Sequence, residues 1–152
     1  MISSLTIEQG GDFFKSWADV FVCPIGLKNE PFNEIAGEFD NALTGFQTSY
    51  IEAMRKAKLD YAKPCLLWSV NPSWHDRMVM LFPIRYDSRN PADLEYIELS
   101  LATFCQQHRW HMLCHSWAFP AIGEEYGADW KEVKRIMVSY LREVNTQVII
   151  YE

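Results

Sequence analysis

The segment at residues 19–25 begins with Asp19 and is otherwise apolar through Ile25, and it constrains the fold more than any other part of the chain. A strand with one face in water alternates apolar and polar side chains, whereas a strand covered on both faces is apolar throughout. Strands of this second kind occur where helices pack on both faces of a sheet. The segment therefore predicts an α/β protein with a buried central strand.

Strand-like and helix-like segments alternate along the rest of the chain. Further strands are predicted at residues 5–7, 65–70, 77–82, 112–119 and 148–151. The two strands around Asn71-Pro72-Ser73 are predicted to form an antiparallel hairpin, because proline suits the second position of a turn. This order predicts a three-layer α/β domain in which helices flank a mixed, mostly parallel central sheet.

Apolar residues spaced three and four apart mark the predicted helices. Over residues 33–58 they indicate a helical region that is interrupted near Thr44-Gly45. A second helix is predicted to have Pro91 in its first turn and to run to about His108. A third is predicted to begin at Asp129, with Glu132 as its capping-box partner.

Length and composition bound the class of protein. A chain of 152 residues with 49% hydrophobic content can bury a core, so we expect a single domain over residues 1–152. The longest apolar stretches, such as residues 79–84, are far shorter than the roughly 18 residues that a membrane span requires. The first residues also lack the basic segment and apolar core of a signal peptide. We therefore expect a soluble cytoplasmic protein with no membrane partner and with reduced cysteines.

The net charge of −6 argues against binding to free nucleic acid, which usually requires a clustered basic surface. The basic residues of the last predicted helix are Lys131, Lys134, Arg135 and Arg142. We interpret them as a solvated helix face. Free nucleic acid is therefore not expected as a partner.

One group of residues has the composition of a metal site. His108, His111, Cys114 and His115 lie within eight residues of one another, a density that suggests zinc. In a strand, however, Cys114 would face away from His111 and His115. We therefore expect no metal, and nothing else in the sequence indicates a cofactor.

Several short motifs follow one another over almost the whole chain. They are Gly11-Asp12 after the first strand, Phe82-Pro83 at the end of the hairpin, Leu94-Glu95-Tyr96-Ile97-Glu98 in a helix, Ala118-Phe119-Pro120 with Gly123, and Asp129-Trp130 before the last helix. Together these motifs resemble the macro domain family, especially the branch of bacterial enzymes that remove ADP-ribose from DNA bases. The resemblance implies the macro-domain fold and an ADP-ribose-like nucleotide as ligand.

The resemblance also implies ligand-binding positions. Asp12 corresponds to an aspartate that accepts a hydrogen bond from the adenine amino group. The positions that hold asparagine and glycine ligands for the distal ribose in the family are occupied here by Cys23, Gly26, Asn29 and Asn33. Two interpretations of Cys23 are open. It is either a thiolate nucleophile activated by Arg85 or a buried thiol that fills space, and we favour the buried thiol.

The second phosphate loop of the family corresponds to residues 123–127. Its expected ligand contacts are Gly123, Tyr126 and Gly127. Glu124 and Glu125 stand where an anion would bind, and each would repel a diphosphate by an amount on the order of 1 kcal/mol. Either these glutamates point outward or the pocket has changed its ligand.

Arg85 stands where the DNA-directed branch has its catalytic lysine. A guanidinium keeps the positive charge but does not readily release a proton, so lysine-type chemistry is not expected. If water attack at the anomeric carbon is retained, Asp87 and Glu124 are the nearest carboxylates to organise it.

Two functions remain open from the sequence. The first is a degenerate macro-fold protein that binds ADP-ribose or a related adenine nucleotide and has little or no glycohydrolase activity; Asp12 and Arg85 favour it. The second is a non-catalytic macro-like module that binds a protein partner through its altered cleft or edges. The loss of both asparagine ligands and of the glycine-rich loop favours this second function. If the chain is an enzyme, it is an ADP-ribosyl glycohydrolase.

Overall fold

The computed structural model describes residues 4–28, 34–55, 65–67, 77–87, 91–107, 113–123 and 127–152. The strands are β1 (Leu5–Glu8), β2 (Val20–Lys28), β3 (Cys65–Leu67), β4 (Met78–Asp87), β5 (Ser116–Phe119) and β6 (Gln147–Tyr151). They form one sheet in the order β1-β6-β5-β2-β4-β3. Five of these strands run parallel, and β3 pairs antiparallel with β4 at one edge. The predicted hairpin pairing and the mixed, mostly parallel sheet are confirmed.

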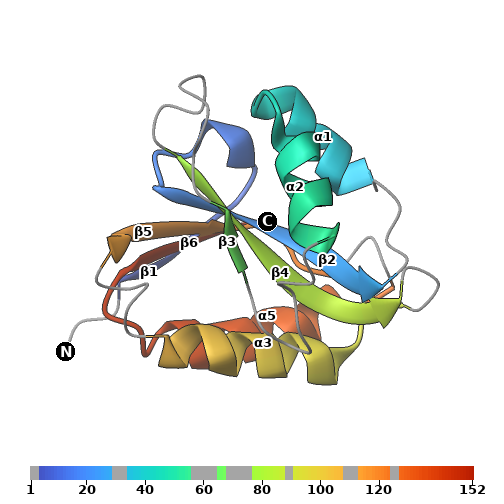
Figure 1. The fold of residues 1–152 in the computed structure, drawn as a ribbon. Helices are drawn as coiled ribbons and strands as arrows, with labels where there is room; N and C mark the ends of the chain where they lie inside the picture. Colours follow the sequence, from blue (N-terminus) through green and yellow to red (C-terminus); the bar gives the residue numbers. More distant parts are fainter. Residues whose placement is uncertain are drawn as a thin grey trace.

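Helices cover both faces of this sheet. The helices are η1 (Phe13–Lys15), α1 (Glu34–Ala42), α2 (Phe46–Arg55), α3 (Leu94–Gln106) and α5 (Trp130–Leu141). Helices α1 and α2 lie on one face and α3 and α5 on the other (Figure 1). The predicted three-layer architecture is therefore confirmed. In the parts of the chain that the structure describes, no helix is long and apolar enough to cross a membrane.

The central strand β2 has a core on each side. Val20 and Val22 belong to the cluster that packs beneath α3 and α5, whereas Phe21 and Cys23 belong to the cluster that packs against α1 and α2. Successive side chains of a strand point to opposite faces of the sheet. Because both faces are covered, the positions of β2 from Val20 to Ile25 need apolar residues, which explains the sequence pattern.

The break predicted near Thr44-Gly45 separates α1 from α2. Gly45 has a φ of +82°, a conformation that glycine adopts without a Cβ clash. Phe39 of α1 and Phe46 of α2 then pack together at 5.3 Å between ring centroids. The glycine lets the chain reverse while both helices keep an apolar face on the sheet.

Several predicted boundaries are wrong. The strand predicted at residues 77–82 continues to Asp87 as β4. Pro91 does not lie in the first turn of α3, which begins at Leu94. Asp93 occupies the N-cap instead, and its carboxylate accepts the N–H of Glu95 at 2.9 Å. Strand β5 begins at Ser116 rather than at residue 112, because its neighbours offer partners only from Val20 and Gln147 onward.

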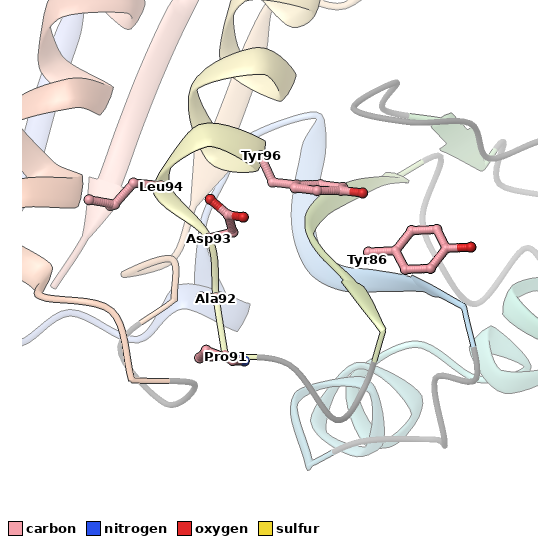
Figure 2. Close-up of a pocket in the computed structure, with 6 residues that line it drawn as sticks. All are labelled: Tyr86, Pro91, Ala92, Asp93, Leu94 and Tyr96. Carbon is pink, nitrogen blue, oxygen red and sulfur yellow. The ribbon is translucent and has the colours of Figure 1, made fainter.

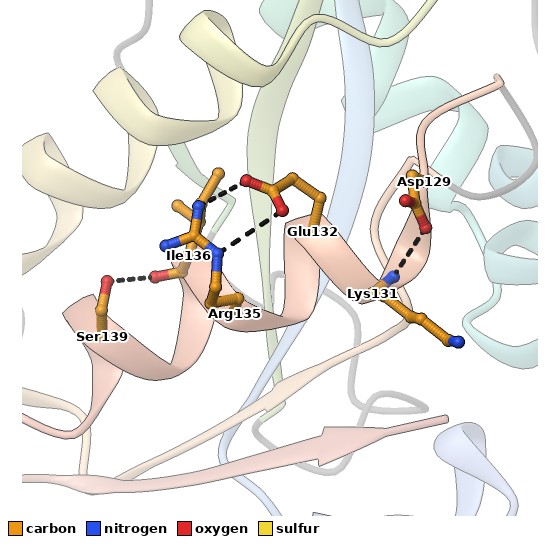
Figure 3. A network of polar contacts seen from close by, with 6 residues as sticks. All are labelled: Asp129, Lys131, Glu132, Arg135, Ile136 and Ser139. Carbon is orange, nitrogen blue, oxygen red and sulfur yellow. Dashed lines mark hydrogen bonds and ion pairs between the residues drawn. The ribbon is translucent and has the colours of Figure 1, made fainter.

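The start of α5 confirms its predicted cap but not the capping box. Asp129 Oδ1 accepts the N–H of Lys131 at 3.1 Å (Figure 3). Both carboxylate oxygens of Glu132 accept instead from the guanidinium of Arg135, one turn further along the same helix. The charge of Arg135 competes for this carboxylate more strongly than a backbone N–H does.

Candidate ligand-binding site

The chain leaves the neighbouring strands β2 and β5 toward opposite faces of the sheet. Strand β2 is followed by α1 on one face, whereas β5 is followed by α5 on the other (Figure 1). A reversal of this kind between adjacent parallel strands leaves a crevice at their carboxyl ends, where open α/β sheets bind ligands. The carboxyl ends of β2 and β5 therefore mark the candidate site.

The two strands part early. Their ladder pairs Val20 with Trp117 and Phe21 with Ala118, and β5 ends one residue later. Strand β2 continues to Lys28 alongside β4 on its other side. The chains thus diverge beyond Phe21, as a crevice between carboxyl ends requires.

Asp12 follows β1 and caps η1. Its Oδ1 accepts the N–H of Phe14 at 3.0 Å, and the residue is exposed. A carboxylate has several acceptor sites, so this bond leaves capacity for a further donor. A groove of about 550 Å³ opens beside it, lined by Gly11, Asp12, Phe13, Phe14, Glu38, Asn41 and Ala42. Asp12 therefore presents an acceptor at the surface between η1 and α1.

Tyr151, at the end of β6, supports the turn that carries Asp12. A Cβ on Gly11 would lie 3.4 Å from the Tyr151 ring, so the turn packs directly on that ring. The Tyr151 hydroxyl donates to Ser16 Oγ at 2.9 Å, and the ring meets Phe13 edge-on at 5.9 Å. The sequence interpretation used Tyr151 only as the end of a strand. A tyrosine at the carboxyl end of a buried strand was the available signal for its role.

The loop after β5 is bounded by two glycines with positive φ. Gly123 has a φ of +83° and Gly127 a φ of +88°. The N–H of Ala128 donates to the carbonyl of Gly123 at 3.0 Å and closes the loop. A Cβ on Gly123 would lie 3.0 Å from the Cβ of Ala128 and 3.3 Å from that of Ala92. Glycine is therefore required at residue 123 by backbone conformation and by space.

Three predicted site residues lie on β2 and β4. Gly26 and Arg85 are register partners, paired just after an irregularity at Ile25. Gly26 is buried and Arg85 is 6% exposed. Cys23 is fully buried in the cluster that faces α1 and α2. This burial fits a thiol that fills space, because a nucleophile must be reachable by its substrate.

Several predicted site residues fall outside the described part of the chain. These are Asn29, Asn33, Glu124, Tyr126 and the side chain of Asp87. Of the remainder, the structure brings Gly26 and Arg85 together. Gly123 and Gly127 follow β5, which is the neighbour of β2 in the sheet. Asp12 lies apart, because its turn packs on β6, three positions from β4 in the sheet order. At about 4.8 Å per strand this separation is roughly 14 Å, so only an elongated ligand reaches both ends.

The carboxylate of Glu152, directly after β6, accepts hydrogen bonds from two residues of α5. Trp130 Nε1 donates to Glu152 Oε1 at 3.1 Å, and Lys134 Nζ lies 3.1 Å and 2.8 Å from the two oxygens. The hydrogen bonds from Lys134 and then from Trp130 lower the pKa of Glu152 below its ordinary value, and Gln9 donates to the same carboxylate. The interpretation of Lys134 as part of a solvated face is therefore wrong, because its ammonium is paired with Glu152.

The depressed pKa of Glu152 predicts a pH dependence of stability. A carboxyl group with a lowered folded-state pKa binds fewer protons in the native state than in the unfolded state. Its contribution is complete above the ordinary value of 4.5 and is lost as the pH falls through the lower folded-state value. Urea unfolding at several pH values should show that the wild type and Glu152→Gln differ most in free energy of unfolding above pH 4.5. The difference should shrink as the pH falls below 4.5. A difference that stays constant with pH would contradict the assignment.

A second depression opens between the end of β4 and the start of α3 (Figure 2). Its volume is about 560 Å³, and it is lined by Tyr86, Pro91, Ala92, Asp93, Leu94 and Tyr96. Tyr86 directly follows Arg85 but is 49% exposed. The sequence interpretation named Tyr96 only within the motif at residues 94–98 and did not use Tyr86, which lies three residues after Pro83.

The cysteine and histidine before β5 are not arranged as the strand prediction assumed. Cys114 is buried, His115 is exposed, and both precede the strand, so strand alternation does not apply to them. Burial, assisted by Asp19, raises the pKa of the Cys114 thiol to about 11, whereas a metal ligand must be a thiolate. Among the residues that the structure describes, no three metal-ligating side chains gather. His108 and His111 lie outside them.

Solved structures share the fold of this chain over almost its whole length. The macrodomain of Thermus aquaticus DarG has a TM-score of 0.83 and 22% identity, covering 97% of each chain. The macrodomain of Mycobacterium tuberculosis DarG has the same TM-score and identity, covering 98% of this chain and 97% of its own. Thermosipho africanus DarTG in complex with ADP-ribose gives a TM-score of 0.84 at 21% identity, over 96% of this chain and 41% of its own.

Sequence comparison alone does not find this relationship. No protein-family model matches the chain, and no curated protein matches it. The evidence is therefore structural, and at these identities it establishes the fold alone. The strand order of the mostly parallel sheet, the two helical layers and the likeness to the DarG macrodomains show that this chain has the macro-domain fold.

Proposed function

We propose that this chain binds ADP-ribose or a related adenine nucleotide in the crevice at the carboxyl ends of β2 and β5. The observation that carries the proposal is the exposed Asp12 carboxylate, which lines a groove between η1 and α1 in a macro-domain fold. The similar Thermosipho africanus DarTG structure holds ADP-ribose. The roughly 14 Å between the Asp12 turn and β4 also suits an elongated nucleotide.

The base end of the ligand is assigned to the Asp12 turn. One Asp12 oxygen is engaged by the N–H of Phe14, and the carboxylate has capacity left for an amino group. Adenine carries such a group on its outer edge. A hydrogen bond from an amino donor to a charged acceptor contributes about 1.5–3 kcal/mol, enough to select an amino-bearing base.

The phosphate and ribose ends are assigned to the glycine positions. The positive φ values at Gly123 and Gly127 turn the backbone so that a loop can surround an anion. Gly26 lets the backbone of β2 approach the distal ribose, because it has no side chain. Arg85, its register partner, supplies positive charge at the same end of the sheet.

Catalysis is expected to be weak or absent. Arg85 is only 6% exposed, and a guanidinium group is not suited to act as a general acid or base. It therefore cannot replace the lysine of the DNA-directed branch in a proton transfer. If hydrolysis persists, Asp87 and Glu124 are the carboxylates proposed to organise the attacking water.

Titration calorimetry and thermal unfolding with ADP-ribose test the binding. Ligand at a hundred times its dissociation constant should add about 2.7 kcal/mol to the free energy of unfolding. Release of ADP-ribose from an ADP-ribosylated DNA strand, measured in parallel, should stay at the background level. Absence of any binding at millimolar ADP-ribose would refute the proposal, and rapid release would refute its catalytic part.

The variant Asp12→Asn should weaken ADP-ribose binding about ten- to a hundredfold, the equivalent of 1.5–3 kcal/mol. Asparagine keeps an oxygen that can cap η1, so the turn is retained. The charged acceptor for the amino group is lost. Asp40→Asn is the matched control, because Asp40 Oδ1 likewise accepts a backbone N–H, that of Gln47 at 2.9 Å. Equal affinities of both variants for ADP-ribose would remove Asp12 from the site.

A second candidate is a non-catalytic module that binds a protein partner through the altered cleft or the sheet edges. The burial of Cys23 favours it, because the side chain at a family ribose position is out of reach of any ligand. The same titration distinguishes the two functions. A chain that is folded but gives no thermal shift with ADP-ribose would favour the protein-binding module.

A further inference from the structure

We propose that Glu152 is a positioning residue that holds two walls of the nucleotide crevice at a fixed separation. One wall is the turn at residues 9–12, which carries Asp12. The other is formed by Gly123, Gly127 and Ala128 together with the start of α5. The proposal rests on the proposed function, because it names the residue that sets the geometry of that same site.

The backbone of Glu152 holds the first wall. Its carbonyl accepts the N–H of Gly10 at 3.1 Å, and its N–H donates to the carbonyl of Glu8 at 2.9 Å. The side chain of Gln9 also lowers the pKa of the Glu152 carboxyl group. The turn that leads into Asp12 is therefore anchored to Glu152 by two backbone hydrogen bonds.

The side chain of Glu152 holds the second wall. Its carboxylate accepts from Trp130 Nε1 at 3.1 Å and from Lys134 Nζ at 2.8 Å. Trp130 is the first residue of α5, two positions after Ala128, whose N–H closes the loop onto Gly123. The Trp130 side chain also packs against the core beneath α5. Displacing this carboxylate would release the helix end that the loop runs into.

Glu152, Trp130 and Lys134 form a cluster that is partly shielded from solvent. The Glu152 side chain is 16% exposed and that of Lys134 is 32% exposed, in contrast to the exposed pair of Glu132 with Arg135 on the same helix. Partly desolvated, multiply bonded groups position neighbouring elements better than exposed ion pairs do. A ligand that spans both walls is sensitive to their separation, whereas a ligand held by one wall is not.

The test compares a long and a short ligand on matched variants. Glu152→Gln and Lys134→Met break the ion pair, Lys134→Arg retains it, and Glu132→Gln breaks the exposed pair instead. Titration calorimetry should show ADP-ribose binding weakened roughly three- to thirtyfold in the first two variants, with adenosine changed by less than about twofold. Lys134→Arg and Glu132→Gln should match the wild type for both ligands. A merely structural role predicts no such difference between the ligands.

Amide hydrogen exchange supplies a readout that needs no ligand. The amides of Gly10 and Ala128 should exchange faster in Glu152→Gln than in Glu132→Gln, because the two walls lose the charged side chain that joins them while the backbone bonds of residue 152 remain. Failure of the wild type to bind ADP-ribose would refute the proposed function and leave this exchange comparison to decide the positioning role. Unchanged exchange at both amides, or equal weakening of ADP-ribose and adenosine, would overturn the proposal for Glu152.

Discussion

Replacing Trp117 with alanine should lower the free energy of unfolding by about 3–5 kcal/mol, the usual cost of removing a buried tryptophan. Trp117 is fully buried in β5, where its ring meets Phe104 of α3 edge-on at 4.8 Å between centroids. Its Nε1 also donates to Thr146 Oγ1 at 3.0 Å. The substitution removes one of the aromatic contacts between the central sheet and α3, and it removes the hydrogen bond that Trp117 donates to the Thr146 hydroxyl.

Urea and thermal unfolding measure this effect. For a domain of this size the melting temperature should fall by on the order of 10 °C. Trp17→Ala is the matched control, because Trp17 is 60% exposed and its removal should change the free energy of unfolding by less than about 0.5 kcal/mol. Similar losses in the two variants would show that the sheet does not pack on α3 as described.

Gly123→Val should destabilise the fold by about 2–5 kcal/mol through two separate effects. The φ of +83° is strained for a β-branched residue. The new Cβ would also lie 3.0 Å from the Cβ of Ala128, so the 123–127 loop must shift. On the proposed function, the same shift should abolish ADP-ribose binding in the protein that remains folded.

Gly10→Val separates the two effects. Gly10 also has a positive φ, +73°, but a Cβ there would meet nothing within 4 Å. This variant should therefore show the strain alone, about 1–2 kcal/mol. If Gly123→Val costs no more than Gly10→Val in urea unfolding, the close packing of the loop against Ala128 and Ala92 is contradicted.

The layered architecture could be predicted because it depends on local patterns. The apolar segment at residues 19–25 required cover on both faces of the sheet, and β2 has a core on each side. The break near Gly45 and the cap at Asp129 were also predicted, because a turn glycine and an N-cap aspartate act within a few residues. The errors at Pro91 and at the start of β5 concern element ends, where tertiary partners decide.

The candidate site was less predictable than the fold. Asp12 and the 123–127 loop were found through motifs, and the structure places both at carboxyl ends of strands. Glu152 was not found as a site residue, because its partners Trp130 and Lys134 are a helix away in the chain. Lys134 was assigned to a solvated face because its partner Glu152 is 18 residues away in the chain. The residues near a lysine on a helix do not indicate a partner at that distance.

The sequence by itself determined which segments form strands and helices and which faces they bury, because these depend on the spacing of apolar residues along the chain. Only the tertiary structure decided that Gly26 lies beside Arg85 and that Glu152 joins the Asp12 turn to α5. Both arrangements depend on parallel pairing between strands that are distant in the chain, and the second depends also on side-chain bonds between Glu152 and α5. The register of such pairing is set by packing across the whole sheet, so no local pattern contains it.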